Sequence, residues 1–125
     1  TPARDSVVTL PPPYNVTSPI SGSQLSRSTD DIDITWNDID PLSSVEVETV
    51  TTCANNNVET FATTELSDDG TITIAAGELT ADTLTGTCST TINIRKIRIG
   101  QFDARFIGGT VNGYQIRRMV IVTTP

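Results

Sequence analysis

The side chains that can do chemistry in this chain are mostly carboxylates, because the sequence has no histidine. Its 125 residues hold 15 acidic and 8 basic side chains, which gives a net charge of −7. The absence of histidine excludes metal sites built on imidazole and catalytic triads built on histidine. An acidic chain is also a poor nucleic-acid binder unless its charges are segregated. The reactive groups that remain are two cysteines, the acidic clusters and the single lysine, Lys96.

The two cysteines, Cys53 and Cys88, are the most informative of these groups. Two thiols alone cannot complete a structural zinc site, so the pattern favours a disulfide over a metal. The alternative is two buried free thiols, which pack as small apolar side chains. A bridge would close a loop of about 36 residues, worth about 4 kcal/mol in the chain-entropy model. Because disulfides persist in oxidising compartments, we expect an extracytoplasmic protein: periplasmic, on the outer surface or secreted.

The acidic residues gather in three clusters, within 30–33, 38–40 and 68–69. Carboxylate oxygens at turns suit Ca²⁺, and Asp38 with Asp40 is the best pair for it. Turn chemistry is the interpretation we favour, because Asp and Asn side chains hydrogen-bond to nearby backbone at turns. We therefore expect no resident cofactor. No two carboxylates are singled out for acid–base hydrolysis, so we expect no enzyme.

The basic residues are concentrated near the C-terminus. Residues 95–125 hold 6 basic and 1 acidic side chain, against 2 basic and 14 acidic in residues 1–94. One interpretation is a basic face for an anionic ligand, with Arg98 and Arg117 as candidate ligand residues. The interpretation we favour is cross-strand pairing with Glu46 and Glu48 on a neighbouring strand. No aromatic side chains alternate with the arginines of the strand 89–99, so no nucleic-acid partner is expected.

Exposed aromatic side chains in a row would indicate a sugar-binding platform. The alternation of residues 31–36 places Trp36 on the inner side of a strand, so we expect it in the core. Phe102 and Phe106 fall in a loop, 101–107, between the last two expected strands. They either form an exposed recognition patch or pack over one end of the fold. As a patch they would join Arg98 and Arg117 in one candidate ligand face.

The elements that must position these groups are strands. Threonine, isoleucine and valine make up 45 of the 125 residues, a balance that favours strands over helices. Short alternating segments separated by turn signals are typical of a sandwich or a barrel. The strands that we expect are 14–26, 31–36, 44–53, 58–66, 71–74, 89–99 and 114–122. The segment 75–79 is predicted to be short or irregular.

This order predicts an all-β fold, an immunoglobulin-like antiparallel β-sandwich of about seven strands. In that topology the strands 44–53, 89–99 and 114–122 share a sheet, and 44–53 runs antiparallel to 89–99. Cys53 ends the first of these strands and Cys88 precedes the second, so the two cysteines fall side by side. The predicted bond therefore lies within one sheet.

One expected strand breaks its own alternation. Ile92 and Ile94 have the opposite parity to Ile97 and Ile99. Side chains that share one buried face of a strand must keep the same parity. We therefore predict a β-bulge near residues 95–96, which would return the later isoleucines to the inner face.

Two segments resemble bacterial secreted immunoglobulin-like (or fibronectin-III-like) domains. The first is 17–26, which contains the pattern P-x-x-G-x-x-L, followed by the strand that ends in Trp36. The second is the strand 69–74, which begins with Asp-Gly. The resemblance implies an extracytoplasmic, modular and mostly non-enzymatic domain, often part of a lipoprotein or a multidomain surface protein. The Cys53–Cys88 placement departs from the antibody pattern, in which the bridge joins two sheets.

Residues 1–13 hold four of the seven prolines, which predicts a semi-rigid tether ahead of one domain over 14–125. We expect a non-catalytic extracytoplasmic module that acts as a binding or spacer domain of a surface protein or lipoprotein. The alternative is a carbohydrate-binding module attached to a secreted enzyme. The expected partner is a protein or a glycan at the cell surface. A membrane would be reached only through an upstream lipid anchor.

Overall fold

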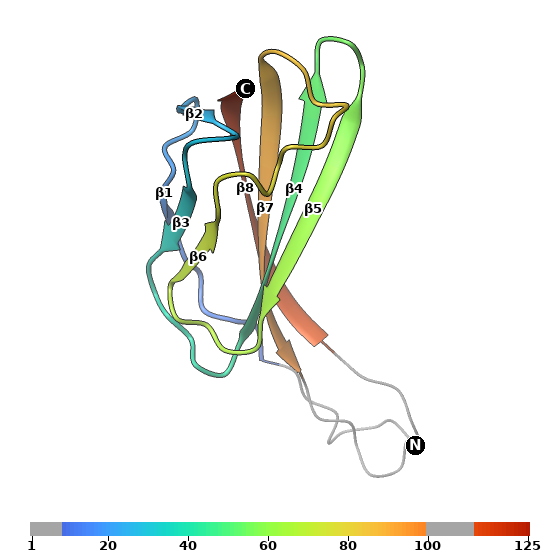
Figure 1. The fold of residues 1–125 in the computed structure, drawn as a ribbon. Helices are drawn as coiled ribbons and strands as arrows, with labels where there is room; N and C mark the ends of the chain where they lie inside the picture. The colour runs from blue at the N-terminus through green and yellow to red at the C-terminus, as the bar shows by residue number, and fades with distance from the viewer. Residues whose placement is uncertain (1–8, 100–111) are drawn as a thin grey trace, which may run out of the picture.

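The computed structural model describes residues 9–99 and 112–125, and within them the chain forms strands and no helix (Figure 1). The strands are β1 (Val16–Ser18), β2 (Gln24–Ser26), β3 (Ile32–Trp36), β4 (Ser44–Cys53), β5 (Val58–Glu65), β6 (Thr71–Ile74), β7 (Cys88–Ile99) and β8 (Asn112–Thr124). Six of the seven predicted strands are confirmed to within two residues at each end. In this part of the chain, no helix is long and apolar enough to cross a membrane.

The strands form two sheets that pack against each other, which confirms the predicted sandwich (Figure 1). One sheet has the order β1-β3-β6 and the other the order β2-β8-β7-β4-β5, so β4, β7 and β8 share a sheet as predicted. The pairs are antiparallel except β2 with β8, which is parallel. The segment 14–26, predicted as one strand, is divided between the two sheets. A turn around Gly22 separates β1 from β2, and the Gly22 N–H donates to the Val120 carbonyl at 2.9 Å.

Alternation along the strands builds the core between the two sheets. On β3, Ile32, Ile34 and Trp36 are buried, as the sequence predicts. On β4, Val45 and Val47 are buried, and Glu46 between them and Glu48 after them face outward. The other buried members of this core are Tyr14, Ile72, Ile74, Leu79, Ile92, Ile94 and Ile121. Removal of these apolar side chains from water is the main force that holds the sheets together.

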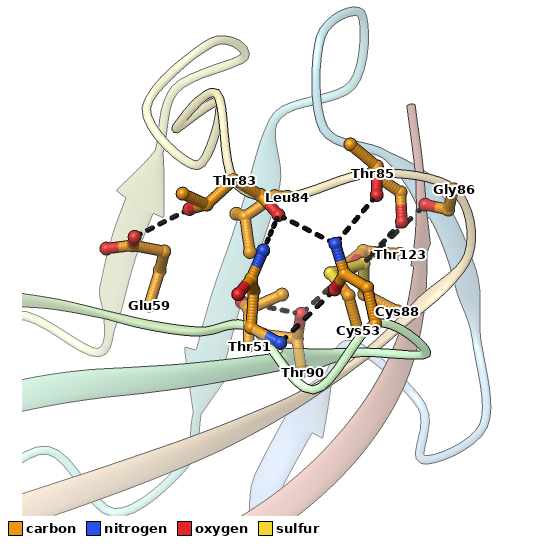
Figure 2. Close-up of a disulfide and its surroundings, with 12 residues drawn as sticks. Thr51, Cys53, Glu59, Thr83, Leu84, Thr85, Gly86, Cys88, Thr90 and Thr123 are labelled. Atoms are coloured by element: carbon orange, nitrogen blue, oxygen red, sulfur yellow. Dashed lines mark hydrogen bonds between the residues drawn. A yellow bond between two sulfur atoms is a disulfide. The ribbon is translucent and has the colours of Figure 1, made fainter.

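Cys53 and Cys88 stand opposite each other on β4 and β7, and a disulfide joins them (Figure 2). Their Cα atoms are 4.2 Å apart, so the bond lies within one sheet as predicted. A row of buried hydroxyls lies beside it. Thr51 Oγ1 is 2.9 Å from Thr90 Oγ1, which is 3.0 Å from Thr123 Oγ1. Because a hydroxyl both donates and accepts, the three hydroxyls satisfy one another, and the Arg27 guanidinium also donates to Thr123 Oγ1 at 3.3 Å.

Arg27 holds the connection between β6 and β7 at the same end of the sandwich. Its buried guanidinium donates to the carbonyl oxygens of Thr123 at 3.1 Å and Gly86 at 2.9 Å. The segment 75–79, predicted to be irregular, forms turns that place Leu79 in the core. The segment that leads into β1 lies at the opposite end of the sandwich from the last residue of β8 (Figure 1).

Candidate functional site

Strand alternation sorts the basic residues of the C-terminal region onto the two faces of the five-stranded sheet. Lys96, Arg98 and Arg117 lie in the inner rows, whereas Arg95 and Arg118 lie in the exposed outer rows. Phe102 and Phe106 of the predicted ligand face lie outside the described residues, as does Arg105, another basic residue of this region. The basic residues of β7 and β8 therefore belong to two places: a charged cluster inside the sandwich and an exposed outer face of the sheet.

Lys96 is the centre of the inner charged cluster, and its side chain is fully buried. Its Nζ atom lies 2.7 Å from Asp68 Oδ2 and donates to the backbone carbonyl of Asp38 at 2.8 Å. The same ammonium group is 4.5 Å from the centroid of the Tyr14 ring. Buried charges are tolerated when they are paired and hydrogen-bonded, and Lys96 meets both conditions.

The β-bulge predicted near residues 95–96 is wrong. β7 pairs with β4 and with β8 in unbroken register through these residues. Ile97 and Ile99 therefore face outward, and Ile99 is 76% exposed. The strand keeps its regular alternation because Lys96, which that alternation places inside, finds a carboxylate there. The sequence pattern favours burial of Ile97 and Ile99. In the structure Lys96 is buried instead, and its charge is paired with Asp68.

Asp68 accepts hydrogen bonds on both of its carboxylate oxygens. Besides Lys96, the Trp36 indole N–H donates at 2.8 Å, the Asp40 backbone N–H at 2.8 Å and the Gly70 N–H at 3.0 Å. Burial by itself raises the pKa of Asp68, but these hydrogen bonds together outweigh it and hold the pKa below its usual range. The group therefore stays ionised and links β3, through Trp36, to β7.

Arg98 forms a second ion pair of the inner cluster, with Asp40. Its Nε and Nη2 atoms lie 2.7 and 2.8 Å from the two carboxylate oxygens, a bidentate contact. The Ser43 hydroxyl donates to the same carboxylate. The hydrogen bond from Arg98 is the largest cause that holds the pKa of Asp40 well below its usual range, and it outweighs burial. This pair ties the loop between β3 and β4 to the end of β7.

The contacts of Asp38 and Asp40, the two predicted calcium ligands, are made within the protein. The Asp40 carboxylate is occupied by Arg98 and Ser43, and the Asp38 carbonyl accepts from Lys96. Within residues 9–99 and 112–125, no three histidine, cysteine, aspartate or glutamate side chains gather so that they could hold a metal ion. The structure therefore gives Asp40 an ion-pairing role in the loop.

Arg117 lies against Tyr14 on the inner side of β8. Its Nε atom donates to the Tyr14 carbonyl at 2.9 Å, and its guanidinium carbon is 4.8 Å from the ring centroid. The Tyr14 hydroxyl donates to the Ile94 carbonyl at 2.8 Å, and burial raises the pKa of Tyr14 to about 12. Arg98 and Arg117, predicted as ligand residues, are thus both engaged with groups inside the sandwich.

The outer face, as we use the term, consists of outward residues of β4, β7 and β8: Glu46, Glu48, Asn93, Arg95, Ile97, Tyr114, Ile116, Arg118 and Val120. A row of large side chains follows β8 on this face. Tyr114, Ile116 and Val120 are 53%, 43% and 42% exposed. Ile97 stands opposite Tyr114 on the neighbouring strand. Ile97, Tyr114 and Ile116 form an apolar group on this face, and Arg118 separates this group from Val120. Apolar groups on a solvent face mark a surface that a partner can cover.

Charged side chains of both signs stand beside this row. Arg95 lies 4.0 Å from Glu46, which confirms the predicted cross-strand pairing for that residue, and 5.3 Å from the centroid of the Tyr114 ring. Arg118 donates to the Asn93 side chain at 2.8 Å. A shallow hollow of about 160 Å³ lies among these side chains, lined by Glu46, Glu48, Asn93, Arg95, Ile116 and Arg118.

No family model, curated protein or solved structure matches this chain. The fold therefore defines its class by itself: a small all-β domain of two packed sheets, with a disulfide inside the larger sheet. The outer face and the inner charged cluster are its two candidate functional regions.

Sequence reasoning did not identify Asp68 as the partner of Lys96, nor Tyr114 and Ile116 as surface residues. For Tyr114 and Ile116 a signal was present, because they share parity with Arg118 and Val120. The opposite row also mixes polar and apolar residues, so parity alone does not say which row faces solvent. For Asp68 no local signal exists, since it lies 28 residues from Lys96 in the sequence.

Proposed function

We propose that this chain is an exported, non-catalytic binding module and that its outer face docks a protein partner. The observation that carries the proposal is the exposed row of Tyr114, Ile116 and Val120 beside Arg95 and Arg118. Tyrosine and arginine set among apolar side chains make up the typical composition of protein–protein hot spots. The hollow of about 160 Å³ is smaller than a typical small-molecule pocket of about 300–1,000 Å³ and suits one protein side chain.

The disulfide supports the exported location, because such bonds persist in oxidising compartments. The resemblance to bacterial secreted immunoglobulin-like domains points the same way. The chain enters and leaves the sandwich at opposite ends (Figure 1), a geometry that suits a module placed in line within a larger surface protein or lipoprotein. The outer face would then be presented sideways to a partner.

A glycan is the alternative partner, as part of a carbohydrate-binding module. A sugar platform needs several aromatic rings that share one exposed surface. Trp36 is buried in the core, and Tyr114 is the only aromatic ring on the outer face within the described residues. The surface therefore favours a protein over a polysaccharide.

The test is site-specific photo-crosslinking in the cells that produce the protein. A photoreactive phenylalanine analogue replaces Ile116 in one variant and Thr71 in a control variant. Thr71 is exposed on β6, in the other sheet. We expect a discrete crosslinked protein from position 116 and none from position 71, and the added change Tyr114→Ala should remove the product. No product from position 116, or the same product from both positions, would overturn the proposal.

A further inference from the structure

The two edges of the five-stranded sheet differ in how their backbone groups are used. At the β8 edge, β2 pairs with the last residues of β8, and the Arg117 guanidinium donates to the Ile116 carbonyl at 3.0 Å. At the other edge stands β5, whose one strand neighbour among the described residues is β4. An edge strand of this kind presents a row of backbone donors and acceptors to solvent.

The turn before β5 shows which of its backbone groups face outward. The Cys53 N–H donates to the Asn57 carbonyl at 3.0 Å, so this pair is a hydrogen-bonded one. Hydrogen-bonded and non-hydrogen-bonded pairs alternate along an antiparallel ladder. In the observed register, the backbone groups that point away from β4 therefore belong to Val58, Thr60, Ala62 and Thr64. Among the described residues, no backbone hydrogen bond outside the ladders involves these four.

The side chains of the same four residues are exposed and uncharged. Natural edge strands are usually protected by lysine, proline or a bulge. β5 contains no lysine and no proline, and it pairs with β4 without a bulge. Its two carboxylates, Glu59 and Glu65, lie in the other row, and Glu59 accepts from the Thr83 hydroxyl at 2.7 Å. This edge therefore lacks lysine, proline and a bulge, and its only charged side chains are the two carboxylates of the inner row.

We propose that β5 pairs antiparallel with β5 of a second copy of this chain, so that two five-stranded sheets form one continuous sheet. A two-fold axis at Phe61 would pair Val58 with Thr64 of the second copy, and Thr60 with Ala62 of the second copy. All of these pairs are uncharged. An axis at Ala62 would instead place Glu59 against Glu65, and like charges directly opposite each other are destabilising.

We choose a second copy as the partner of β5 because the outward row of this strand can pair with the same row of another copy. A two-fold contact uses the same surface patch on both copies, and the row from residue 58 to residue 64 fits that condition. The pairing would also bring the outer faces of the two copies onto one side of the joined sheet. The inference does not depend on the proposed function, because β4 and β7 separate β5 from β8, the strand that carries the Tyr114 row.

The experiment measures the mass of the disulfide-bonded full chain by light scattering during size-exclusion chromatography, over a range of concentrations. Ala62→Pro removes an N–H that points away from β4, and Ala62→Lys adds a charge to the edge. Thr52→Lys adds the same charge to an exposed outward position one strand further in, on β4. Far-UV circular dichroism checks that each variant keeps the fold.

We expect about twice the 13.4 kDa mass of one chain for the wild type and for Thr52→Lys, and the single mass for both edge variants. A single mass for the wild type at every concentration would overturn the inference, and so would a dimer that persists in both folded edge variants. A wild-type chain that gains mass only in cell extract would indicate a foreign strand and also overturn it. Tyr114→Ala should leave the dimer unchanged, so the two proposals fail separately.

Discussion

The inner row of β7 has apolar isoleucines at its centre and other kinds of side chain at its two ends, and the two ends differ in how these side chains are held. At one end Cys88 is bonded to Cys53, and Thr90 belongs to a row of hydroxyls. At the other end Lys96 and Arg98 pair with carboxylates. Between the two ends lie isoleucines of the apolar core. The side chains of this row are thus uncharged at the disulfide end, which we call the neutral end, and charged at the other. Arg27, from outside the row, donates to Thr123 at the neutral end.

The partners of the two ends come from different parts of the molecule. The neutral end uses β4, β7 and β8, which already share a sheet. The charged end uses Asp40 and Asp68, from the loops after β3 and β5, and Asp68 also holds Trp36 of the other sheet. The covalent bond therefore closes a sheet that its ladders already hold, whereas the charges fasten the two sheets to each other.

The largest expected effect is at the charged end. Asp68→Asn leaves the Lys96 ammonium group buried without its counter-charge. Breaking a buried pair by removing one partner costs about 3–5 kcal/mol. We expect a loss of that size in the free energy of unfolding measured by urea denaturation. Asp69→Asn, at the neighbouring exposed position, is the matched control and should change the value little.

A double variant sharpens this prediction. Replacement of both members of a buried pair by neutral groups is often close to neutral, because no charge is left without a partner. Lys96→Met combined with Asp68→Asn should therefore recover much of the stability that Asp68→Asn alone loses. A double variant as unstable as the sum of its single changes would mean that Lys96 and Asp68 act independently.

The next effect is at the neutral end. Loss of the disulfide in a Cys53→Ser, Cys88→Ser variant should cost about 4 kcal/mol, from the closed loop of about 36 residues. The loss should appear in urea denaturation and should match that of the reduced wild type. The intact mass of the native protein should rise by about 2 mass units on reduction, for two added hydrogens. An unchanged mass would show that the native protein has no Cys53–Cys88 disulfide, and the proposed export would lose its main support.

Lowering the pH should decrease the free energy of unfolding by a smaller amount. The pKa values of Asp40 and Asp68 are both held below their usual range in the folded protein. The unfolded chain, with an Asp pKa of about 3.9, then binds protons more tightly than the folded one. This contribution to stability is complete above that pKa and is lost as the pH falls through the folded values.

The urea midpoint should therefore drop as the pH is lowered below about 4. The drop should be shallower in Asp40→Asn, which has already lost one of the two carboxylates, and unchanged in the exposed control Asp82→Asn. An equal drop in all three proteins would place the acid sensitivity elsewhere.

The sequence predicts the strands well because alternation is a local pattern, and it predicts the disulfide because the expected sheet order brings two strand ends together. Alternation in 31–36 and 44–53 gives the correct inward rows, and the position of each cysteine at a strand end gives the bond. The register of β7 is different. A hydropathy pattern counts Lys96 as a surface residue, whereas the structure buries it against a partner 28 residues away. A pattern of neighbouring residues cannot reveal Asp68 as the partner of Lys96. The pattern therefore predicts a bulge that does not form.

The candidate site was partly predictable for the same reason. Pairing of Glu46 with a basic residue follows from the expected sheet order and is observed with Arg95. The inward placement of Arg98 and Arg117 depends on Asp40 and Tyr14, which arrive from distant segments. The predicted ligand residues Phe102 and Phe106 lie outside the described residues. Charge segregation along a sequence thus indicates a basic region without showing which of its members face solvent.

The smallest expected change in stability comes from two buried threonines of β4. It tests whether the row of hydrogen-bonded hydroxyls extends from Thr51 to Thr49. Thr49 and Thr51 are both buried in the inner row, but only the Thr51 hydroxyl has a hydrogen-bond partner within the described residues. Thr49→Val removes a buried hydroxyl that makes no bond, so stability should rise by about 1 kcal/mol. Thr51→Val removes a hydroxyl that bonds to Thr90, so stability should fall by about the same amount. Urea denaturation of both variants, with the disulfide intact, measures the two signs side by side. A decrease in both would mean that the Thr49 hydroxyl is satisfied, and that the hydroxyl row reaches one step closer to the charged end.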